Sequence, residues 1–279
     1  MPEIVRTVSE LRQHASRWHA KGLKVAVVPT MGALHDGHLM LVREGLKHAD
    51  KVIVTIFVNP KQFAANEDLG KYPRTPEQDV EMLASVNADL VYAPTPDTMY
   101  APQFATTIHM AGPALAGLED KFRPHFFDGV ATVVAKLFIQ SQADVAMFGE
   151  KDYQQLMVVK QMTRDLDIPT SVIGIPTVRD DDGMAKSSRN RYLTKHERHQ
   201  STAIIRSLHQ AAEKIRKGVD PQSATKAASR SLTTLGFKVD YVAARNATTL
   251  ALPKLRDEPL RLLAAVWMGT TRLIDNIAV

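Results

Sequence analysis

The chain has 279 residues, of which 44% are hydrophobic, and its 35 Lys and Arg against 30 Asp and Glu give a formal net charge of +5. This composition is typical of a globular protein of about two domains and excludes an intrinsically disordered chain. The absence of cysteine excludes disulfide scaffolds, thiolate zinc sites, iron–sulfur clusters and cysteine nucleophiles.

The N-terminal segment mixes charged residues into every turn and lacks the apolar core of a signal peptide. The longest apolar runs, Val52–Val58 and Leu262–Met268, are too short to cross a bilayer. We therefore expect a cytoplasmic protein with no membrane partner.

Short apolar strands alternate with helices along the first two thirds of the chain. A first helix is expected over residues 3–20. Strands are expected over residues 24–28, 52–58, 89–92, 143–148 and 171–178, and further helices over 34–48, 76–86, 127–140 and 153–166. This alternation is typical of a parallel sheet with crossover helices, in which ligands bind beyond the carboxyl ends of the strands. The sequence therefore predicts an α/β fold with a Rossmann-like domain over residues 1–182.

After the turn-rich segment Arg179–Gly183 the pattern changes. Helices are expected over residues 194–217 and 221–235, and strands over 239–243 and 261–266. These elements predict a smaller α+β C-terminal domain over residues 183–279. Residues 184–230 hold eleven Lys or Arg and three Asp or Glu, a local charge of +8. Such a block is typical of a phosphate-rich ligand, a nucleic-acid surface or a solvated helix face.

The segment Thr30–His38 lies between a predicted strand and a predicted helix. Its glycines, Gly32 and Gly37, allow a ligand to approach the backbone closely. His35 and His38 share one face of the first helical turn, where the helix dipole and free N–H groups favour a phosphate. A metal pair, a capping turn and incidental surface histidines are the alternatives. The dinucleotide fingerprint and the Walker A pattern are absent, which argues against hydride transfer and a P-loop ATPase.

The segment Phe148–Gln155 follows the fourth predicted strand. Within it, Lys151 can neutralise phosphate charge and Asp152 can accept hydrogen bonds from ribose hydroxyls. The alternative is a solvated charged turn.

The segment Met184–Asn190 follows the fifth predicted strand and supplies a dense set of anion donors on a potentially mobile loop. These donors are Lys186, Ser187, Ser188 and Arg189. The alternative is an ordinary basic linker.

The segment Phe57–Phe63 follows the second predicted strand. Its amides, Asn59 and Gln62, stand beside aromatic residues and suit a small polar organic substrate. The alternative is a loop amide satisfied by the backbone.

Together these motifs resemble those of the pantoate–β-alanine ligase (pantothenate synthetase) family. The resemblance runs from Val25 to Tyr192 and continues more weakly to Leu273–Asn276. The matching segments are Pro29–His38, Phe57–Phe63, Lys71–Thr75, Phe148–Asp152 and Ser187–Asn190. The segments His35–His38 and Lys186–Arg189 also resemble the HIGH element and the KMSKS loop of class I aminoacyl-tRNA synthetases and small nucleotidyltransferases.

The resemblance implies a two-step, AMP-forming ligase of pantothenate biosynthesis, on the pathway to coenzyme A. ATP and pantoate would give pantoyl adenylate and pyrophosphate with Mg²⁺ present, and the amine of β-alanine would then release pantothenate and AMP. The family also forms homodimers through its N-terminal domain.

The resemblance further implies a set of site residues. His35, His38 and Lys151 would be catalytic, with a proton-donating role for His38, and the 186–189 loop would close over ATP. ATP would contact Met31, Gly32, His35, His38, Gly149, Glu150, Lys151, Asp152, Val178, Lys186, Ser187, Ser188 and Arg189. Pantoate and β-alanine would contact Asn59, Gln62 and Gln155.

The chain departs from the family pattern in two places. Lys186 stands where the family usually has Met or Leu. His125 stands one position early, so that Phe126 occupies the usual histidine position, whereas Glu119 and Arg123 match.

Two other functions remain as alternatives. A nucleotidyltransferase acting on a phosphorylated small molecule would share the two histidines but would not need Gln62, Gln155 or a C-terminal domain. A nucleic-acid-binding protein would use the basic block, in which Tyr192 is the only Phe, Tyr or Trp available for stacking. We therefore expect small-molecule substrates and no nucleic-acid partner.

Overall fold

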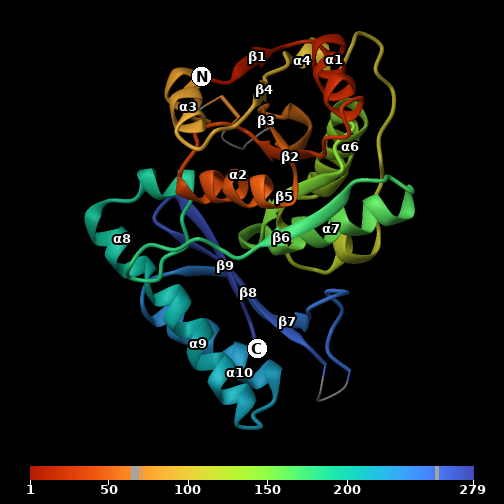
Figure 1. Ribbon diagram of the computed structural model, residues 1–279. Coiled ribbons are helices and arrows are strands. Elements are labelled where there is room, and N and C mark those ends of the chain that lie inside the picture. Colours follow the sequence, from red (N-terminus) through yellow and green to blue (C-terminus); the bar gives the residue numbers. More distant parts are fainter. Residues whose placement is uncertain (64–68, 71, 255–257) are drawn as a thin grey trace.

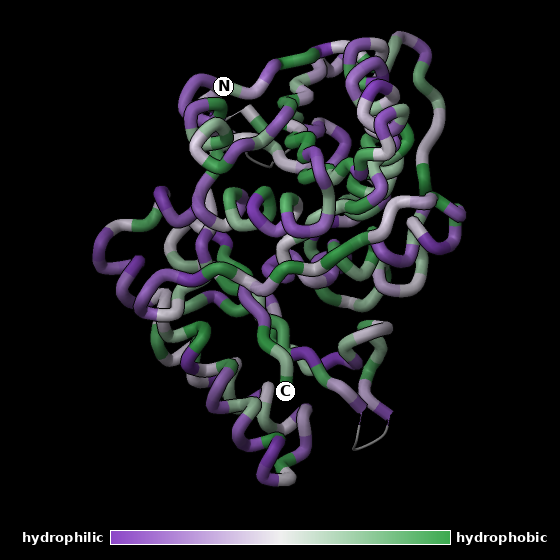
Figure 2. The backbone as a smooth tube through the Cα atoms, viewed as in Figure 1, coloured by the Kyte–Doolittle hydropathy of each residue, from purple (hydrophilic) through white to green (hydrophobic). Residues whose placement is uncertain are grey.

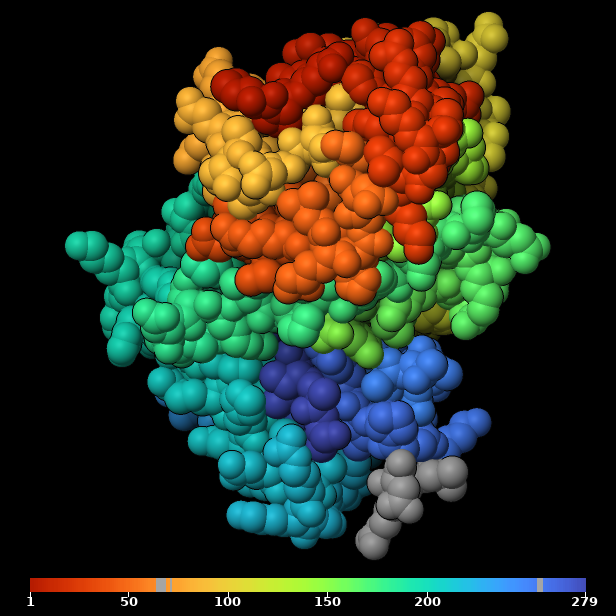
Figure 3. Space-filling view, viewed as in Figure 1, coloured from red at the N-terminus to blue at the C-terminus, as the bar shows by residue number. Residues whose placement is uncertain are grey.

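The computed structural model describes residues 1–63, 69–70, 72–254 and 258–279, and it consists of two parts stacked on one another (Figure 1). The larger part is built on a six-stranded sheet and the smaller part on a three-stranded sheet. In the space-filling view, the teal and blue C-terminal end of the chain forms the smaller part (Figure 3). Lys71, the first residue of one motif quoted above, lies outside the described residues.

The larger part is a parallel sheet with the strand order β1-β4-β3-β2-β5-β6. Its strands are β1 (Glu3–Val5), β2 (Val25–Thr30), β3 (Lys51–Ile56), β4 (Leu90–Tyr92), β5 (Val145–Gly149) and β6 (Ser171–Ile175). From β2 the chain adds β3 and β4 on one side and then places β5 on the other side of β2. Parallel sheets bind ligands at such a reversal, beyond the carboxyl ends of the strands.

Helices cover both faces of this sheet because its central strands are apolar on both sides. In β2, Val25 and Val27 face one core while Ala26 and Val28 face the other. The first core includes α1 (Val8–His19), α6 (Phe126–Ser141) and α7 (Tyr153–Asp165), and the second includes α2 (Asp36–His48) and α3 (Pro76–Ala84). The sheet is therefore the rigid middle layer to which the loops at its carboxyl edge are attached.

The smaller part packs two helices on an antiparallel sheet. The sheet has the order β7 (Lys238–Asn246), β8 (Leu260–Met268) and β9 (Thr271–Ala278), and the helices are α9 (Ala203–Arg216) and α10 (Pro221–Thr234). Figure 2 shows that α9 and α10 carry both hydrophobic and hydrophilic residues, as expected for helices with one buried side. Leu262 of β8 packs with these helices, whereas Leu263 joins the core of the larger part. The small sheet is thus packed on both faces.

Short helical turns connect these elements. They are η1 (Pro60–Gln62), α4 (Pro96–Met99), η2 (Gly112–Leu115), α5 (Glu119–Phe122), η3 (Glu150–Asp152), η4 (Ser188–Tyr192) and α8 (Lys195–Ser201).

The α/β fold class is confirmed, but three elements differ from the sequence prediction. The helix expected over 3–20 begins only at Val8, because Thr7 and Glu10 form a capping box that leaves the preceding residues free to form β1. The helix expected over 194–217 is interrupted at Thr202. Strand β9 was not expected, because polar residues interrupt its apolar pattern.

Candidate active site

A cavity of about 230 Å³ lies at the carboxyl edge of the parallel sheet, next to the ends of β2 and β5. Fourteen of the sixteen residues expected at the site line this cavity. They are Met31, His35, His38, Asn59, Gln62, Gly149, Lys151, Asp152, Gln155, Val178, Lys186, Ser187, Ser188 and Arg189. The structure therefore brings together four motifs that lie far apart in the chain, and the ion pair of Asp36 with Lys186 joins residues 150 positions apart.

The other two expected residues, Gly32 and Glu150, do not line the cavity. Gly32 is buried with φ +80°, and a Cβ at this position would lie 3.0 Å from Asp79 Oδ2. Glu150 points to the smaller part, where its Oε2 accepts a hydrogen bond of 2.9 Å from Arg261. Gly32 and Glu150 thus contact Asp79 and Arg261, and not the cavity.

His35 and His38 cap the start of α2. The Nδ1 of His35 accepts from the Gly37 N–H at 3.1 Å, and the Nδ1 of His38 accepts from the His35 N–H at 3.3 Å. Because each Nδ1 is an acceptor, the neutral rings carry their proton on Nε2. The capping-turn interpretation is therefore correct, and the same bonds leave two Nε2–H groups as donors at the cavity wall.

Both histidines are neutral at pH 7. Burial lowers the pKa of His38 to about 3 and that of His35 to about 4, and the positive charge of Lys151 acts in the same direction. The ring centroids are 4.1 Å apart, so a charge on either ring would disfavour a charge on the other. A neutral ring of this kind can donate a hydrogen bond through its Nε2–H group. The proton-donating role expected for His38 stays a prediction.

A buried carboxylate holds the loop between β2 and α2. Asp79 of α3 is 1% exposed, and it accepts hydrogen bonds from the N–H groups of Ala33 at 3.0 Å and Leu34 at 2.9 Å. Its hydrogen bond with the Thr75 hydroxyl measures 3.1 Å. Sequence reasoning missed Asp79, because a carboxylate in a short amphipathic helix is usually solvated.

The amides of the Phe57–Phe63 segment have different surroundings. Asn59 is 1% exposed, and its Nδ2 donates to Gly129 O at 3.1 Å and to Gln62 Oε1 at 3.2 Å. Its Oδ1 accepts from the Tyr100 hydroxyl at 2.8 Å. Asn59 thus fixes the orientation of Gln62, which is itself partly exposed to the cavity.

The 186–189 loop is tied to the start of α2 by the residue that departs from the family pattern. Lys186 Nζ lies 2.7 Å from Asp36 Oδ2 and 2.9 Å from Asp180 Oδ1. These hydrogen bonds raise the pKa of Lys186 and, from the other side, lower the pKa of Asp36. The loop is therefore attached to the first residue of α2, next to His35.

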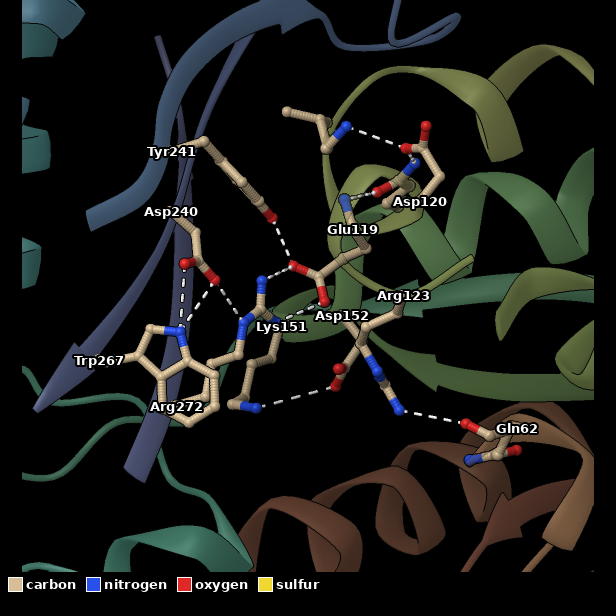
Figure 4. Close-up of polar contacts among 12 residues, drawn as sticks. Gln62, Glu119, Asp120, Arg123, Lys151, Asp152, Asp240, Tyr241, Trp267 and Arg272 are labelled. Atoms are coloured by element: carbon tan, nitrogen blue, oxygen red, sulfur yellow. Dashed lines mark hydrogen bonds and ion pairs between the residues drawn. The ribbon is translucent and has the colours of Figure 1, made fainter. Parts of the chain in front are cut away.

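A second cavity of about 590 Å³ adjoins the first, between the two parts of the molecule. Lys151, Asp152 and Gln155 line both cavities. Figure 4 shows the polar contacts on its wall. The Glu119 carboxylate accepts hydrogen bonds from Arg272 and from the Tyr241 hydroxyl, and the Asp240 carboxylate accepts from Arg272 and from the Trp267 indole N–H.

The wall shared by the two cavities also contains Phe126, the residue that follows His125. Phe126 lines both cavities and lies 3.7 Å from the Arg123 guanidinium, whereas His125 is exposed at the start of α6. Phe126 therefore occupies the cavity side of this segment in place of the histidine.

Two further observations concern ligands and membranes. Within the described residues, the hydroxyl of Thr177 lies buried at the smaller cavity without a hydrogen-bond partner, a polar atom that sequence reasoning did not single out. Among the same residues, no group of three or more His, Asp or Glu side chains could hold a metal ion, and no helix is long and apolar enough to span a bilayer.

This site and fold define an α/β enzyme of the kind that acts on nucleotides. The family model for pantoate–β-alanine ligases matches residues 3–278. The chain belongs to the pantoate–β-alanine ligase family.

Individual relatives agree with this assignment over the full length. The pantothenate synthetases of a Bradyrhizobium species and of Caulobacter vibrioides are each 54% identical to the chain, covering 100% of it and 99% of their own length. The crystal structure of pantothenate synthetase from Thermus thermophilus has a TM-score of 0.92 at 41% identity, covering 99% of this chain and 98% of its own. A Francisella tularensis pantoate–β-alanine ligase, described as complexed with β-γ ATP and β-alanine, has a TM-score of 0.82 at 33% identity and covers 100% of this chain and 98% of its own.

Proposed function

We propose that the chain condenses pantoate with β-alanine at the expense of ATP, through a pantoyl adenylate. The observation that carries this proposal is the convergence of two neutral Nε2–H donors and the Lys151 ammonium on one cavity. Gln62 and Gln155 line the same cavity. A carboxylate is a poor acyl donor until its oxygen becomes part of a good leaving group, and adenylation provides that group.

In the first step, a carboxylate oxygen of pantoate attacks the α-phosphorus of ATP and the bond to pyrophosphate breaks. His35 and His38 donate hydrogen bonds to the phosphate oxygens on which negative charge grows, and Lys151 supplies a positive charge. The start of α2 adds its dipole in the same direction. Because both histidines are neutral, they stabilise this charge without a proton-transfer step.

The remaining cavity residues hold the substrates. Gln62, oriented by Asn59, and Gln155 bind the hydroxyl and carboxylate groups of pantoate, and Asp152 accepts from the ribose. In the second step, the amine of β-alanine attacks the acyl carbon, AMP leaves, and the amine loses a proton to solvent. The larger cavity adjoins Gln155, which gives β-alanine a route to the acyl carbon.

The described residues suit a Mg²⁺ ion that is carried by the nucleotide. Mg²⁺ commonly keeps several waters and is held largely by substrate phosphates, so the ion can arrive on ATP and needs few ligands from the chain. When bound, the ion neutralises phosphate charge.

Several further features belong to the same proposal. Residues 1–182 bind ATP and pantoate, and residues 183–279 cover the site from the other side, with Lys186, Ser187, Ser188 and Arg189 closing over ATP and Val178 beside adenine. The enzyme is a cytoplasmic homodimer. The separate core of the smaller part supports the division into two domains. The family membership supports the other features.

The test is pyrophosphate release from ATP and Mg²⁺ with pantoate, measured with and without β-alanine. We expect a pantoate-dependent burst of about one pyrophosphate per site, followed by continuous turnover when β-alanine is added. His38→Ala and Lys151→Ala should each slow the burst by about 10²–10³-fold, since removing one preorganised donor has an effect of this size. Near-normal bursts in both variants would contradict the roles proposed here. The absence of any pantoate-dependent release would favour a nucleotidyltransferase that acts on a phosphorylated acceptor.

A further inference from the structure

Strand β9 of the smaller part contacts the turn that carries Lys151. Asn276 on this strand is 3% exposed. Its Nδ2 donates one hydrogen bond of 2.9 Å to the carbonyl oxygen of Glu150 and another of 2.9 Å to that of Lys151. One buried amide thus holds two successive carbonyl groups.

These carbonyl groups belong to a short turn with few hydrogen bonds of its own. Residues Glu150–Asp152 form a single 3₁₀ turn between β5 and α7. The hydrogen-bond geometry of a 3₁₀ turn is poorer than that of an α-helix, so a donor from outside the turn helps to fix its backbone. The Lys151 backbone is therefore set by Asn276, 125 residues further along the chain.

Asn276 is itself held in one orientation. Its Oδ1 accepts from Arg261 Nε at 2.6 Å, which directs the Nδ2 group toward the turn. The same guanidinium donates to Glu150 Oε2 at 2.9 Å and lies 4.0 Å from the centre of the Tyr153 ring. Arg261 therefore contacts residues on both sides of Lys151.

The neighbouring residue on β9 is fixed as well. Asp275 forms two hydrogen bonds with Arg179, at 2.7 and 2.9 Å, and accepts from the Asn276 N–H at 2.7 Å. Arg179 follows β6 of the larger part. This segment of β9 is thus attached to the carboxyl edge of the parallel sheet, where the reaction is proposed to occur.

We propose that Asn276 is a positioning residue for adenylate formation, which aims the Lys151 side chain by holding the backbone of its turn. This inference rests on the proposed function. A lysine has a long, flexible side chain, so the position of its ammonium group depends on where its backbone is held. A misplacement of about 1 Å from the productive geometry can slow a reaction by about 10²-fold.

The primary variant is Asn276→Asp, which keeps the shape of the side chain and an acceptor for Arg261 but removes the amide donors. The rate of pyrophosphate formation is measured in a single turnover with enzyme in excess over ATP, and pantoate affinity is measured separately. We expect the rate to fall by about tenfold or more while pantoate affinity changes by less than about twofold. Leu232→Val is the matched control, because it loosens the core of the smaller part at α10. It should lower Tm without slowing this step.

A double-mutant cycle separates positioning from a structural role. In a Lys151→Met background, Asn276→Asp should slow the reaction by less than about twofold, because the group it positions is already gone. If Asn276→Asp does not fold, Arg261→Lys replaces it in the same cycle, with a smaller loss expected in the same step.

Three results would overturn the proposal. One is an unchanged rate in Asn276→Asp, and another is an equal loss in both backgrounds. A third is a slower pyrophosphate formation in Leu232→Val that accompanies its lower Tm, since the rate would then depend on the stability of the smaller part and not on Asn276. Wild-type protein that releases no pantoate-dependent pyrophosphate would instead overturn the proposed function, and this inference with it.

Discussion

Replacing His38 with Gln is expected to make the stability of the protein less sensitive to acid. Burial lowers the pKa of His38 to about 3, against an ordinary value near 6.5. As the pH falls below about 6.5, the unfolded chain takes up a proton on this ring and the folded chain does not. The stabilisation is therefore complete above pH 6.5 and is lost as the pH falls toward the folded-state pKa.

The size of the effect follows from the pKa values. One pKa unit corresponds to about 1.4 kcal/mol, so lowering the pH from 7 to 5 reduces the free energy of unfolding by roughly 2 kcal/mol for each such ring. Burial lowers the pKa of His35 to about 4, so His35 contributes a similar reduction in the free energy of unfolding. The pair should thus account for about 4 kcal/mol of lost stability over this range.

The assay is urea unfolding of wild type and His38→Gln at pH 7 and pH 5. Carboxylates also contribute to acid sensitivity, but they do so equally in both proteins, so the difference isolates the histidine. His196→Gln, at an exposed position on α8, is the matched control and should retain the wild-type loss. If His38→Gln loses as much stability as wild type between these pH values, burial does not hold His38 neutral and the proposed donor role of a neutral ring fails.

Three further substitutions test other parts of the site. Lys186→Met removes the ion pair with Asp36, whose side chain is 63% exposed, so calorimetry should show only a modest change in ATP affinity. Complete loss of adenylation would instead show that the lysine is catalytic. Gly129→Ala would place a Cβ 2.3 Å from the Lys61 carbonyl oxygen, and overpacking of this kind should destabilise the protein by about 1–3 kcal/mol, seen as a lower Tm. An unchanged Tm would mean that the backbone at the contact of α6 with η1 can shift to accommodate the added methyl group without loss of stability. Asp79→Asn keeps one acceptor oxygen but replaces the other with an NH₂ group, so that one of the two backbone N–H groups faces a donor. It should lower stability by about 1–3 kcal/mol and slow the pyrophosphate burst, whereas a normal burst would show that the loop does not need this carboxylate.

The parallel sheet was predictable because its inner strands are runs of buried β-branched residues bounded by turn signals. Strand β1 escaped prediction because it has three residues and one buried side chain, too few to show a period. Strand β9 escaped for another reason. Its residues Arg272, Asp275 and Asn276 are polar because they pair with charged or backbone groups of the larger part, and only the folded molecule supplies those partners.

The cavity wall was largely predictable because its residues lie in local motifs directly after strands. The residues that hold those motifs in place could not be found in this way. Asp79 and Arg261 look like ordinary surface charges in the sequence, and only their burial, at 1% and 9% exposure, shows that each is fixed by specific partners. The ion pair of Lys186 with Asp36 joins residues 150 positions apart, which no local pattern encodes.

The dependence of the Lys151 turn on Asn276 also bears on biosynthesis. The two residues are 125 positions apart, and a ribosome adding about 5–20 residues per second takes roughly 6–25 s to cover that distance. During this interval the growing chain already contains the histidine pair and Lys151 but not the amide that holds the turn of the lysine. We therefore expect a chain that lacks the last strand to activate a carboxylate more slowly than the complete chain.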